Sequence, residues 1–293
     1  MKILIVGHKG QLGRVILDTP TDHAFVGIDL PERDITDADD VIPTILDLNP
    51  DAVINPAAFT NVDAAEADPD LAYRVNAHGA GHIARACHQL GIPMIQISTN
   101  EVFAGTAETP YDEWDQRSAR SVYARSKLAG ENAVRFYHDQ VLIVRIAWLF
   151  SPGGVNFPAK IVAAADKHGA LRVVDDEFGN PTYAPDLAPA LLALLDHHAP
   201  PGIYHITNRG SCSRYEFAVE VLRQMGRANV PVTPIPHSEW PRPSQPPLRA
   251  LLANRAAAAL GIQLRPWQEA VAAWAESERQ KNAVISNSAM SNE

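Results

Sequence analysis

The sequence contains very few cysteines. Only Cys87 and Cys212 occur in 293 residues, and neither belongs to a C-x-x-C pair or another metal-ligand spacing. This pattern excludes a disulfide framework and a zinc site of the usual spacing. Unpaired cysteines are typical of a reducing compartment, so we expect a cytoplasmic protein.

Long hydrophobic runs are also missing. The strongest one, 141–150, is interrupted by Arg145, and it is much shorter than the roughly 20 residues that cross a bilayer. The apolar run at the N-terminus ends at Gly7, too early for the core of a signal peptide. We therefore expect neither a membrane segment nor export by that route.

Basic residues are outnumbered by acidic ones. The chain has 25 Lys and Arg against 34 Asp and Glu, which gives a net charge of -9. This charge repels a phosphate backbone, so nucleic acid is excluded as the main partner. Apolar residues make up 46% and charged residues 20% of the chain, which is the balance of a folded globular protein with a sizeable core.

The first 150 residues alternate short β-branched runs with longer amphipathic stretches. The runs predict strands at 2–6, 24–29, 52–55, 94–98 and 141–146. The stretches predict helices that begin near residues 10 and 36 and helices over 71–90 and 122–137. Parallel neighbours need crossover helices, so this alternation predicts an α/β fold with a doubly wound, Rossmann-like parallel sheet.

Three glycines, Gly7, Gly10 and Gly13, follow the first predicted strand and open the first predicted helix. Glycine permits a tight turn and a close backbone approach, and a helix N-terminus offers free N–H groups to a pyrophosphate. The spacing therefore predicts a dinucleotide site, with a packing role for Gly13 as the alternative.

The choice of dinucleotide depends on Asp29, which ends the second predicted strand. A carboxylate there accepts hydrogen bonds from ribose hydroxyls and favours NAD, although a plain turn residue is the alternative. Lys9 and Arg33 lie close in sequence and are able to neutralise a 2′-phosphate. NADH and NADPH therefore both stay open as cofactors.

Tyr123 and Lys127 are four residues apart on a predicted helix and so share one face. An ammonium beside a phenol lowers the phenol's pKa, and such a tyrosine exchanges a proton near neutral pH. Ser98 and Thr99 end the fourth predicted strand, at the edge where α/β sheets bind ligands, and a hydroxyl there can bind a reacting carbonyl. The alternatives are a solvated helix face and a strand-end hydroxyl.

A metal site is not predicted. His78 and His82 are also four residues apart, but no third ligand accompanies them. After residue 150 the pattern is less regular, with helices expected over 185–197 and 215–225 and an irregular proline-rich segment over 231–247. We predict a dinucleotide-binding domain at 1–150, a smaller, mainly substrate-binding region at 151–278 that can return to the first sheet, and a flexible tail at 279–293.

Further segments are the pair Gln11-Leu12 and residues 34–37, 50–55, 57–60, 62–63, 75–77, 102–103, 123–131, 145–150, 156–157 and 265–267. Together with the motifs above, they resemble the extended short-chain dehydrogenase/reductase family over nearly all of residues 1–275. The resemblance implies a reductase that moves hydride from NADPH or NADH to the C4 ketone of a dTDP-bound deoxyhexose, foremost dTDP-4-dehydro-L-rhamnose.

The resemblance also implies roles for individual residues. Tyr123 supplies the proton, Lys127 binds the nicotinamide ribose and tunes Tyr123, Thr99 holds the substrate carbonyl, and Trp148 lines the sugar pocket. The implied cofactor contacts are Gly10, Gln11, Leu12, Asp29, Asp34, Ile35, Ala57, Ala58 and Phe59.

Three positions depart from the family pattern, one of them Ala124, where glycine is common. Asn100 and Glu101 stand where the family usually has Asp and Tyr, and Asn100 lies at a position implicated in sugar contact. A different dTDP-4-keto sugar therefore stays open as the substrate. A non-catalytic, cofactor-binding regulatory subunit is a further alternative, against which the intact Thr99, Tyr123 and Lys127 argue. The carboxylates for a magnesium ion at a dimer contact are not found, and a homodimer stays open.

Overall fold

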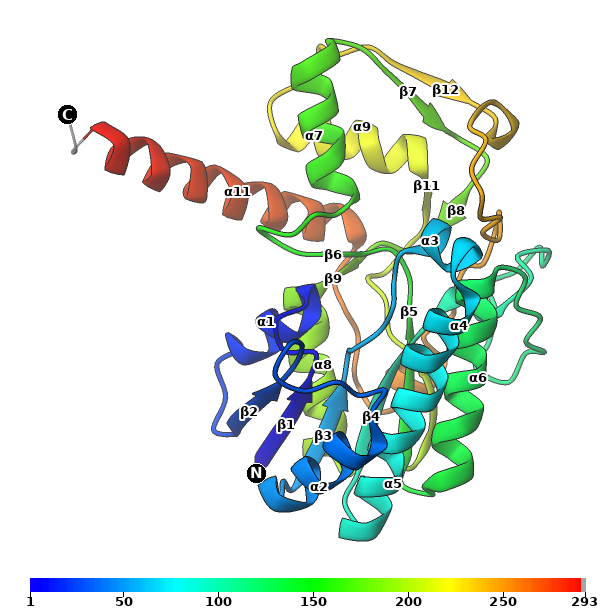
Figure 1. Cartoon of the computed structure of the whole chain (residues 1–293). Coiled ribbons are helices and arrows are strands. Elements are labelled where there is room, and N and C mark those ends of the chain that lie inside the picture. The colour runs from blue at the N-terminus through cyan, green and yellow to red at the C-terminus, as the bar shows by residue number, and fades with distance from the viewer. Residues whose placement is uncertain (291–293) are drawn as a thin grey trace.

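The computed structural model describes residues 1–290, and side chains as far as residue 281. Its centre is a six-stranded parallel sheet (Figure 1) with the strand order β10-β5-β4-β3-β1-β2. The strands are β1 (Lys2–Val6), β2 (Ala24–Ile28), β3 (Ala52–Asn55), β4 (Met94–Thr99), β5 (Val141–Ile146) and β10 (Gly202–His205). The predicted α/β fold is confirmed.

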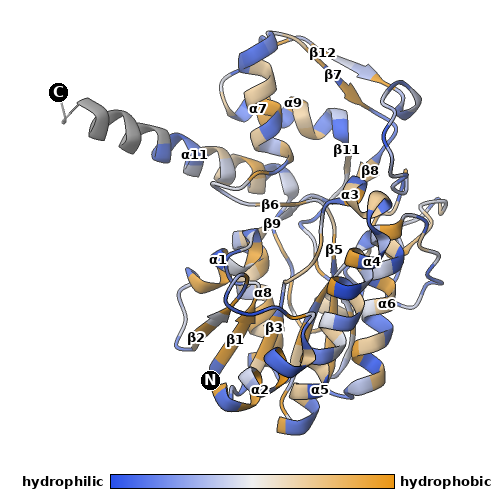
Figure 2. Ribbon diagram, viewed as in Figure 1, coloured by the Kyte–Doolittle hydropathy of each residue, from blue (hydrophilic) through white to orange (hydrophobic). Residues whose placement is uncertain are grey.

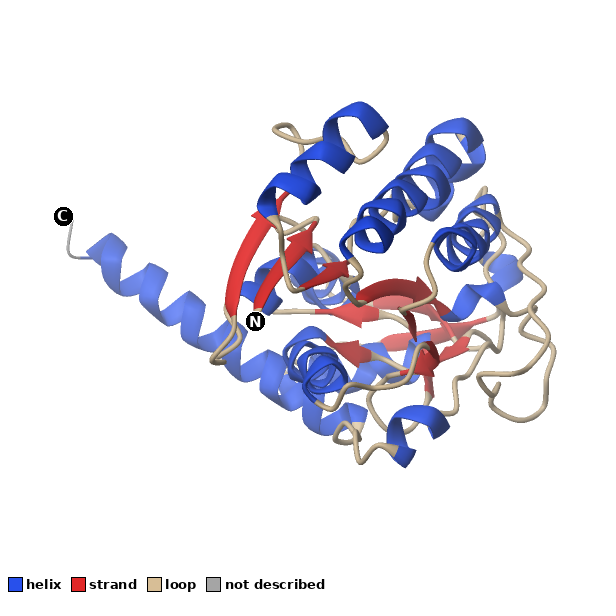
Figure 3. Cartoon of the chain, turned by 90° about the horizontal axis from the view of Figure 1, so that it is seen from below, coloured by secondary structure: helices blue, strands red, loops and turns tan. Residues whose placement is uncertain are grey.

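Helices cover both faces of this sheet, as Figure 3 shows from below. Alternate strand residues point to opposite faces, so Ile3 and Ile5 enter one core and Leu4 and Val6 the other. The first core lies under α1 (Gln11–Leu17) and α8 (Ala184–Asp196). The second lies under α2 (Ala38–Leu48), α5 (Ala80–Leu90) and α6 (Val122–Tyr137). The strands are accordingly apolar along most of their length (Figure 2).

The segment predicted as one helix over 71–90 is broken into several pieces. It contains α4 (Pro69–Tyr73), a π-helical segment η1 (Arg74–Gly79) and α5, and it follows α3 (Val62–Ala67). Asn76 in η1 accepts a hydrogen bond from the Phe59 N–H at 2.8 Å and donates to the Phe59 carbonyl at 3.1 Å. This anchoring of a loop explains a local departure from α-helical geometry that apolar periodicity does not report.

The second region packs above the carboxyl ends of the strands (Figure 1). Its elements are β6 (Leu149–Phe150), α7 (Phe157–His168), β7 (Leu171–Val174), β8 (Phe178–Gly179), β9 (Thr182–Tyr183), β11 (Cys212–Ser213), α9 (Arg214–Gln224) and β12 (Val232–Ile235). A separate aromatic core around Phe150, Phe217 and Trp274 holds them together. Between these elements the chain returns to the first sheet as α8 and β10.

Two C-terminal expectations differ from the structure. The segment 231–247 contains β12, which pairs with β7, and a 3₁₀ turn η3 (His237–Glu239), so an irregular course is wrong for these residues. Pro234 is accepted because β12 is an edge strand. Helix α11 (Trp267–Met290) continues through 279–290 (Figure 1), where a tail is predicted. That stretch contains neither Gly nor Pro to end it; residues 291–293 lie outside the described part.

The order of the strands determines where a ligand can bind. The neighbours of β1 are β2 on one side and β3 on the other, so the crossover connections diverge there and leave an opening at the carboxyl ends. None of the described helices has the length and apolar character that crossing a bilayer requires.

Candidate active site

A crevice of about 540 Å³ opens at this edge of the sheet, between the strand ends and the second region. The second region contributes Leu149, Val155 and Arg214 to its wall. The predicted site residues that line it are Gly7, Gly10, Gln11, Leu12, Gly13, Asp29, Asp34, Ile35, Ala57, Ala58, Thr99, Asn100, Tyr123, Lys127 and Trp148. Phe59 does not line it; its side chain packs near Tyr123 and Val122 instead.

The glycine turn forms the floor of this crevice. Gly7 has φ +87°, and a Cβ atom there would lie 2.8 Å from Ala57 Cα. A Cβ atom on Gly13 would lie 2.3 Å from the Gly7 carbonyl oxygen. Side chains are therefore excluded from both positions, and Gly10 precedes α1 without a side-chain cap. A bare backbone with free N–H groups fits the pyrophosphate of a dinucleotide.

Asp29 lies beside the same turn. Its carboxylate accepts hydrogen bonds at 2.8 Å from the backbone N–H groups of Lys9 and Leu30, which hold it at the end of β2. The Lys9 ammonium lies 2.5 Å from Glu32, and Lys9 does not line the crevice. Arg33 does line it and lies 3.2 Å from Asp40. Of the two cations considered, only Arg33 is part of the crevice lining.

Tyr123, Lys127 and Thr99 converge on the crevice from two elements. Ser121 caps α6 by accepting from the Ala124 N–H at 3.1 Å, and the helix then places Tyr123 and Lys127 one turn apart. Thr99 ends β4, and its hydroxyl lies near enough to Tyr123 to lower the pKa of the phenol slightly. A phenol, a hydroxyl and an ammonium thus line one crevice, where a carbonyl oxygen can be polarised and protonated.

The expected lowering of the Tyr123 pKa is wrong. Burial raises the pKa of this phenol, and the negative charge of Glu101 raises it further. Lys127 does not counteract this, because its Nζ donates to the Ile97 carbonyl at 2.7 Å and its own pKa falls to about 8 through burial. Tyr123 is therefore a neutral phenol at pH 7, the form that gives up a proton.

A buried ion pair lies beneath these residues. Arg145, which is fully buried, donates to both carboxylate oxygens of Glu131 at 2.8 Å, and Ser98 donates to the same carboxylate at 2.7 Å. Burial opposes ionisation of Glu131, but these contacts outweigh it and keep its pKa below the usual value. The Glu131 charge in turn favours the charged form of Lys127, four residues earlier on α6.

Sequence reasoning missed the roles of Glu101 and Arg214. Glu101 lines the crevice, and burial raises its pKa to about 7 although Arg214 and Arg242 oppose the shift. In the sequence, Glu101 was notable only as a departure from the family pattern. Arg214 begins α9, more than a hundred residues later, and nothing local in the sequence indicates that it reaches the crevice.

Trp148 and Asn100, the residues expected to contact the sugar, both contact residues of the second region. Trp148 has φ +47°, an unfavourable conformation for an aromatic residue, and the Arg214 guanidinium lies 3.7 Å from its ring centroid. Gly179 packs against the same ring, where a Cβ atom would lie 2.3 Å away. Asn100 Nδ2 donates to the Ala250 carbonyl at 2.9 Å, so that amide group also ties β4 to the second region.

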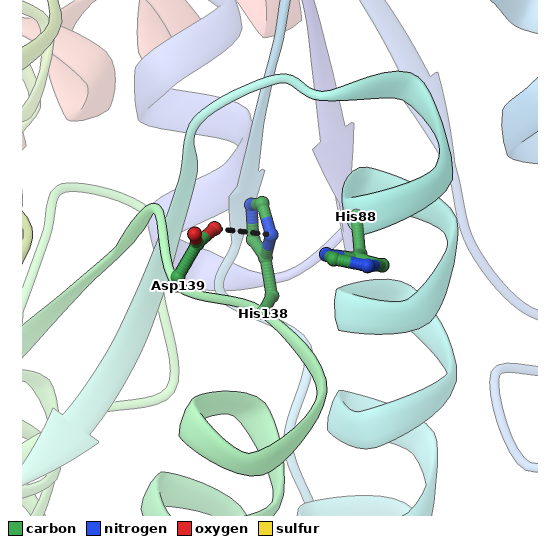
Figure 4. A group of neighbouring side chains, drawn as sticks. All are labelled: His88, His138 and Asp139. Atoms are coloured by element: carbon green, nitrogen blue, oxygen red, sulfur yellow. Dashed lines mark ion pairs between the residues drawn. The ribbon is translucent and has the colours of Figure 1, made fainter.

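One cluster of metal-type ligands occurs among the described residues, away from the crevice. His88, His138 and Asp139 come together (Figure 4) just before β5 begins, at the opposite edge of the sheet. His138 Nε2 lies 2.8 Å from the Ile92 carbonyl, and Nδ1 lies 3.7 Å from Asp139. His78 and His82 are not part of this cluster, and His82 binds the Ile35 carbonyl. The cluster adds no group to the crevice.

Residues 1–280 match the family described as the RmlD substrate binding domain. The chain belongs to this family. It is 38% identical over 275 residues to the dTDP-4-dehydrorhamnose reductase of Mycolicibacterium smegmatis, an alignment that covers 92% of this chain and 84% of the relative.

Two solved structures are similar over nearly the whole chain. A dTDP-4-dehydrorhamnose reductase of Clostridium acetobutylicum superposes with a TM-score of 0.91 at 38% identity and covers 94% of this chain and 99% of its own. The Bacillus anthracis dTDP-4-dehydrorhamnose reductase, solved in complex with NADP, gives a TM-score of 0.88 at 32% identity, with 93% and 98% covered. The match of this family member to an NADP-bound structure agrees with the glycine-turn geometry described above.

Replacement of Glu131 by Gln should destabilise the fold, because it leaves the buried guanidinium of Arg145 without its charge partner. We expect a loss of about 3–5 kcal/mol in the free energy of unfolding, measured by urea denaturation. The exposed Glu108→Gln serves as the control and should change it by less than about 0.5 kcal/mol. A double variant Glu131→Gln/Arg145→Met should lose less than the two single losses added together; full additivity would contradict the pairing.

The raised pKa of Glu101 should appear in the pH dependence of stability. Between the usual 4.5 and about 7, folded Glu101 keeps a proton that the unfolded chain releases, so raising the pH through this window destabilises the fold. Glu101→Gln lacks this penalty. Relative to wild type, the variant should gain roughly 2–3 kcal/mol between pH 5 and pH 8, measured by denaturation at both values. A pH-independent difference would show that Glu101 titrates normally.

Proposed function

We propose that this chain is an NAD(P)H-dependent reductase of the C4 ketone of a dTDP-bound deoxyhexose, converting dTDP-4-dehydro-L-rhamnose to dTDP-L-rhamnose. The observation that carries the proposal is the convergence of Tyr123, Thr99 and Lys127 in the crevice beside the glycine turn. Relatives with 38% identity that carry the name dTDP-4-dehydrorhamnose reductase support it. A purely structural or regulatory role does not require this convergence.

The cofactor site fits NAD(P)H because Gly7 and Gly13 leave space that any Cβ atom would fill. Gly10, Gln11 and Leu12 would hold the pyrophosphate, Asp29 and Asp34 the adenosine end, and Lys127 the nicotinamide ribose. When bound, NAD(P)H supplies the hydride. Gln11 also donates to the Leu149 carbonyl at 3.2 Å, so the cofactor turn is connected to the second region.

Side chains of the protein would then stabilise and neutralise the negative charge that develops on the substrate oxygen. Thr99 donates a hydrogen bond to that oxygen, and Tyr123 transfers its phenolic proton as the ketone becomes an alcohol. The high pKa of Tyr123 keeps this proton in place until the oxygen becomes basic. The Lys127 ammonium, which is mostly charged below about pH 8, would bind the nicotinamide ribose rather than tune Tyr123.

The substrate would enter between the strand ends and the second region. Trp148 and Arg214 form the wall on that side, and a guanidinium there suits the diphosphate of a sugar nucleotide. We also propose a cytoplasmic location, which the free, buried thiols of Cys87 and Cys212 support.

Replacement of Tyr123 by Phe should reduce turnover while leaving cofactor binding intact. Loss of a general acid should lower kcat about 10²–10⁴-fold, and the Kd of NADPH should stay within about threefold, since the phenyl ring is retained. Tyr137→Phe, in an exposed position of the same helix, is the control and should behave as wild type. Steady-state kinetics with dTDP-4-dehydro-L-rhamnose and fluorescence titration measure the two quantities; unchanged turnover rules out the mechanism.

Arg33 should decide between the two reductants. Arg33→Ser should raise the Kd of NADPH about tenfold through loss of a charge-assisted contact to the 2′-phosphate, with the Kd of NADH unchanged. Lys9→Ser is the matched control, because Lys9 is bound to Glu32 and lies outside the crevice lining. Equal effects of Arg33→Ser on both cofactors would mean that Arg33 supports the local fold instead.

A further inference from the structure

The carboxyl group of Glu101 has no assigned task in the reaction described above. Glu101 follows Thr99 and Asn100 in the short helix η2 (Asn100–Val102) and lines the crevice. Its Oε2 atom is inaccessible to solvent and has no hydrogen-bond partner among the described residues. An unsatisfied carboxyl oxygen costs free energy when buried, and the Glu101 side chain as a whole is only partly buried and borders the crevice.

The protein groups around Glu101 are already engaged with one another. Ser121 is near enough to the Glu101 carboxyl to lower its pKa, and its Oγ accepts from the Ala124 N–H. From the second region, Arg242 forms an ion pair with Glu177, and Arg214 lies 3.9 Å from the same carboxylate. These two guanidinium groups face Glu101 and lower its pKa, but they are bound to Glu177. Within the part of the chain whose side chains are described, Glu101 forms no ion pair of its own.

Glu101 also lies close to the reacting groups. Its backbone N–H donates to Thr99 Oγ1 at 3.2 Å, and its charge is near enough to Tyr123 to raise the pKa of the phenol. A sugar whose C4 oxygen meets Thr99 and Tyr123 therefore brings the neighbouring ring carbons toward Glu101. In a 6-deoxyhexose, C5 carries only a methyl group besides the ring oxygen, so C3 is the neighbour of C4 that bears a hydroxyl.

We propose that Glu101 binds the C3 hydroxyl of the hexose and thereby selects which 4-keto sugar is reduced. This role rests on the reductase function proposed above. A carboxylate accepts a hydrogen bond from the hydroxyl, and a carboxylic acid can both accept and donate, so the contact forms in either state. Tyr at this position, as in the family pattern, would present a hydroxyl in place of two acceptor oxygens. Glu101 is thus a specificity-determining residue of this site.

The test couples a change in the enzyme to a change in the substrate. We would measure kcat/KM of wild type, Glu101→Ala, Glu101→Gln and the exposed control Glu108→Gln on dTDP-4-dehydro-L-rhamnose and its 3-deoxy analogue. A site built around a hydroxyl should make wild type and the control prefer the hydroxylated ketone by about 100-fold or more. Glu101→Ala should reduce this preference to below about fivefold, with little change on the 3-deoxy ketone.

Glu101→Gln keeps the size of the side chain and carries the test if the Ala variant does not fold. Its amide retains one acceptor oxygen, so the preference should fall about tenfold. Equal losses on both ketones in Glu101→Ala, or an unchanged preference in Glu101→Gln, would overturn the role of Glu101 alone. A wild-type enzyme that reduces neither ketone with either cofactor would overturn the reductase function and this role with it.

Discussion

The buried ion pair between Arg145 and Glu131 is the interaction on which the site depends. It joins β5 to α6, and through Ser98 it also holds the end of β4. Arg145 Nη1 lies 3.3 Å from His205 on β10, whose pKa is depressed by burial and by this guanidinium to about 3, so that its ring stays neutral. Strands β4, β5 and β10 and helix α6 are thus connected through one ion pair, and separating its two buried charges would be energetically costly.

Burial, more than contact between Tyr123 and Lys127, sets the protonation states in the crevice. Desolvation raises the pKa of Tyr123 and Glu101 and lowers that of Lys127. Each shift favours the neutral form of the group. A reductase in this arrangement begins its reaction with a protonated phenol, while Lys127 and Arg214 are charged members of the crevice lining at pH 7.

Much of the architecture could be predicted from sequence because secondary structure depends on patterns among neighbouring residues. Strand β5 and helix α6 begin and end at the predicted residues, since β-branched runs and helix periodicity are properties of neighbouring residues. The crevice followed from the rule that parallel strands bind ligands at their carboxyl ends. Arg214 could not be predicted, because the tertiary fold brings it from α9 to Trp148. The Tyr123 pKa was predicted with the wrong sign because its burial is a product of packing.

The return of the chain to the first sheet constrains how this molecule can be divided. Leu187, Leu191 and Leu194 of α8 fill the core on one face of the central sheet. In the sequence, however, α8 comes after β6, α7, β7, β8 and β9, which belong to the second region. Cutting near residue 150 would strip that face of its cover and remove strand β10 from the sheet edge. The second region is therefore not one contiguous stretch of sequence that could be exchanged without also removing α8 and β10.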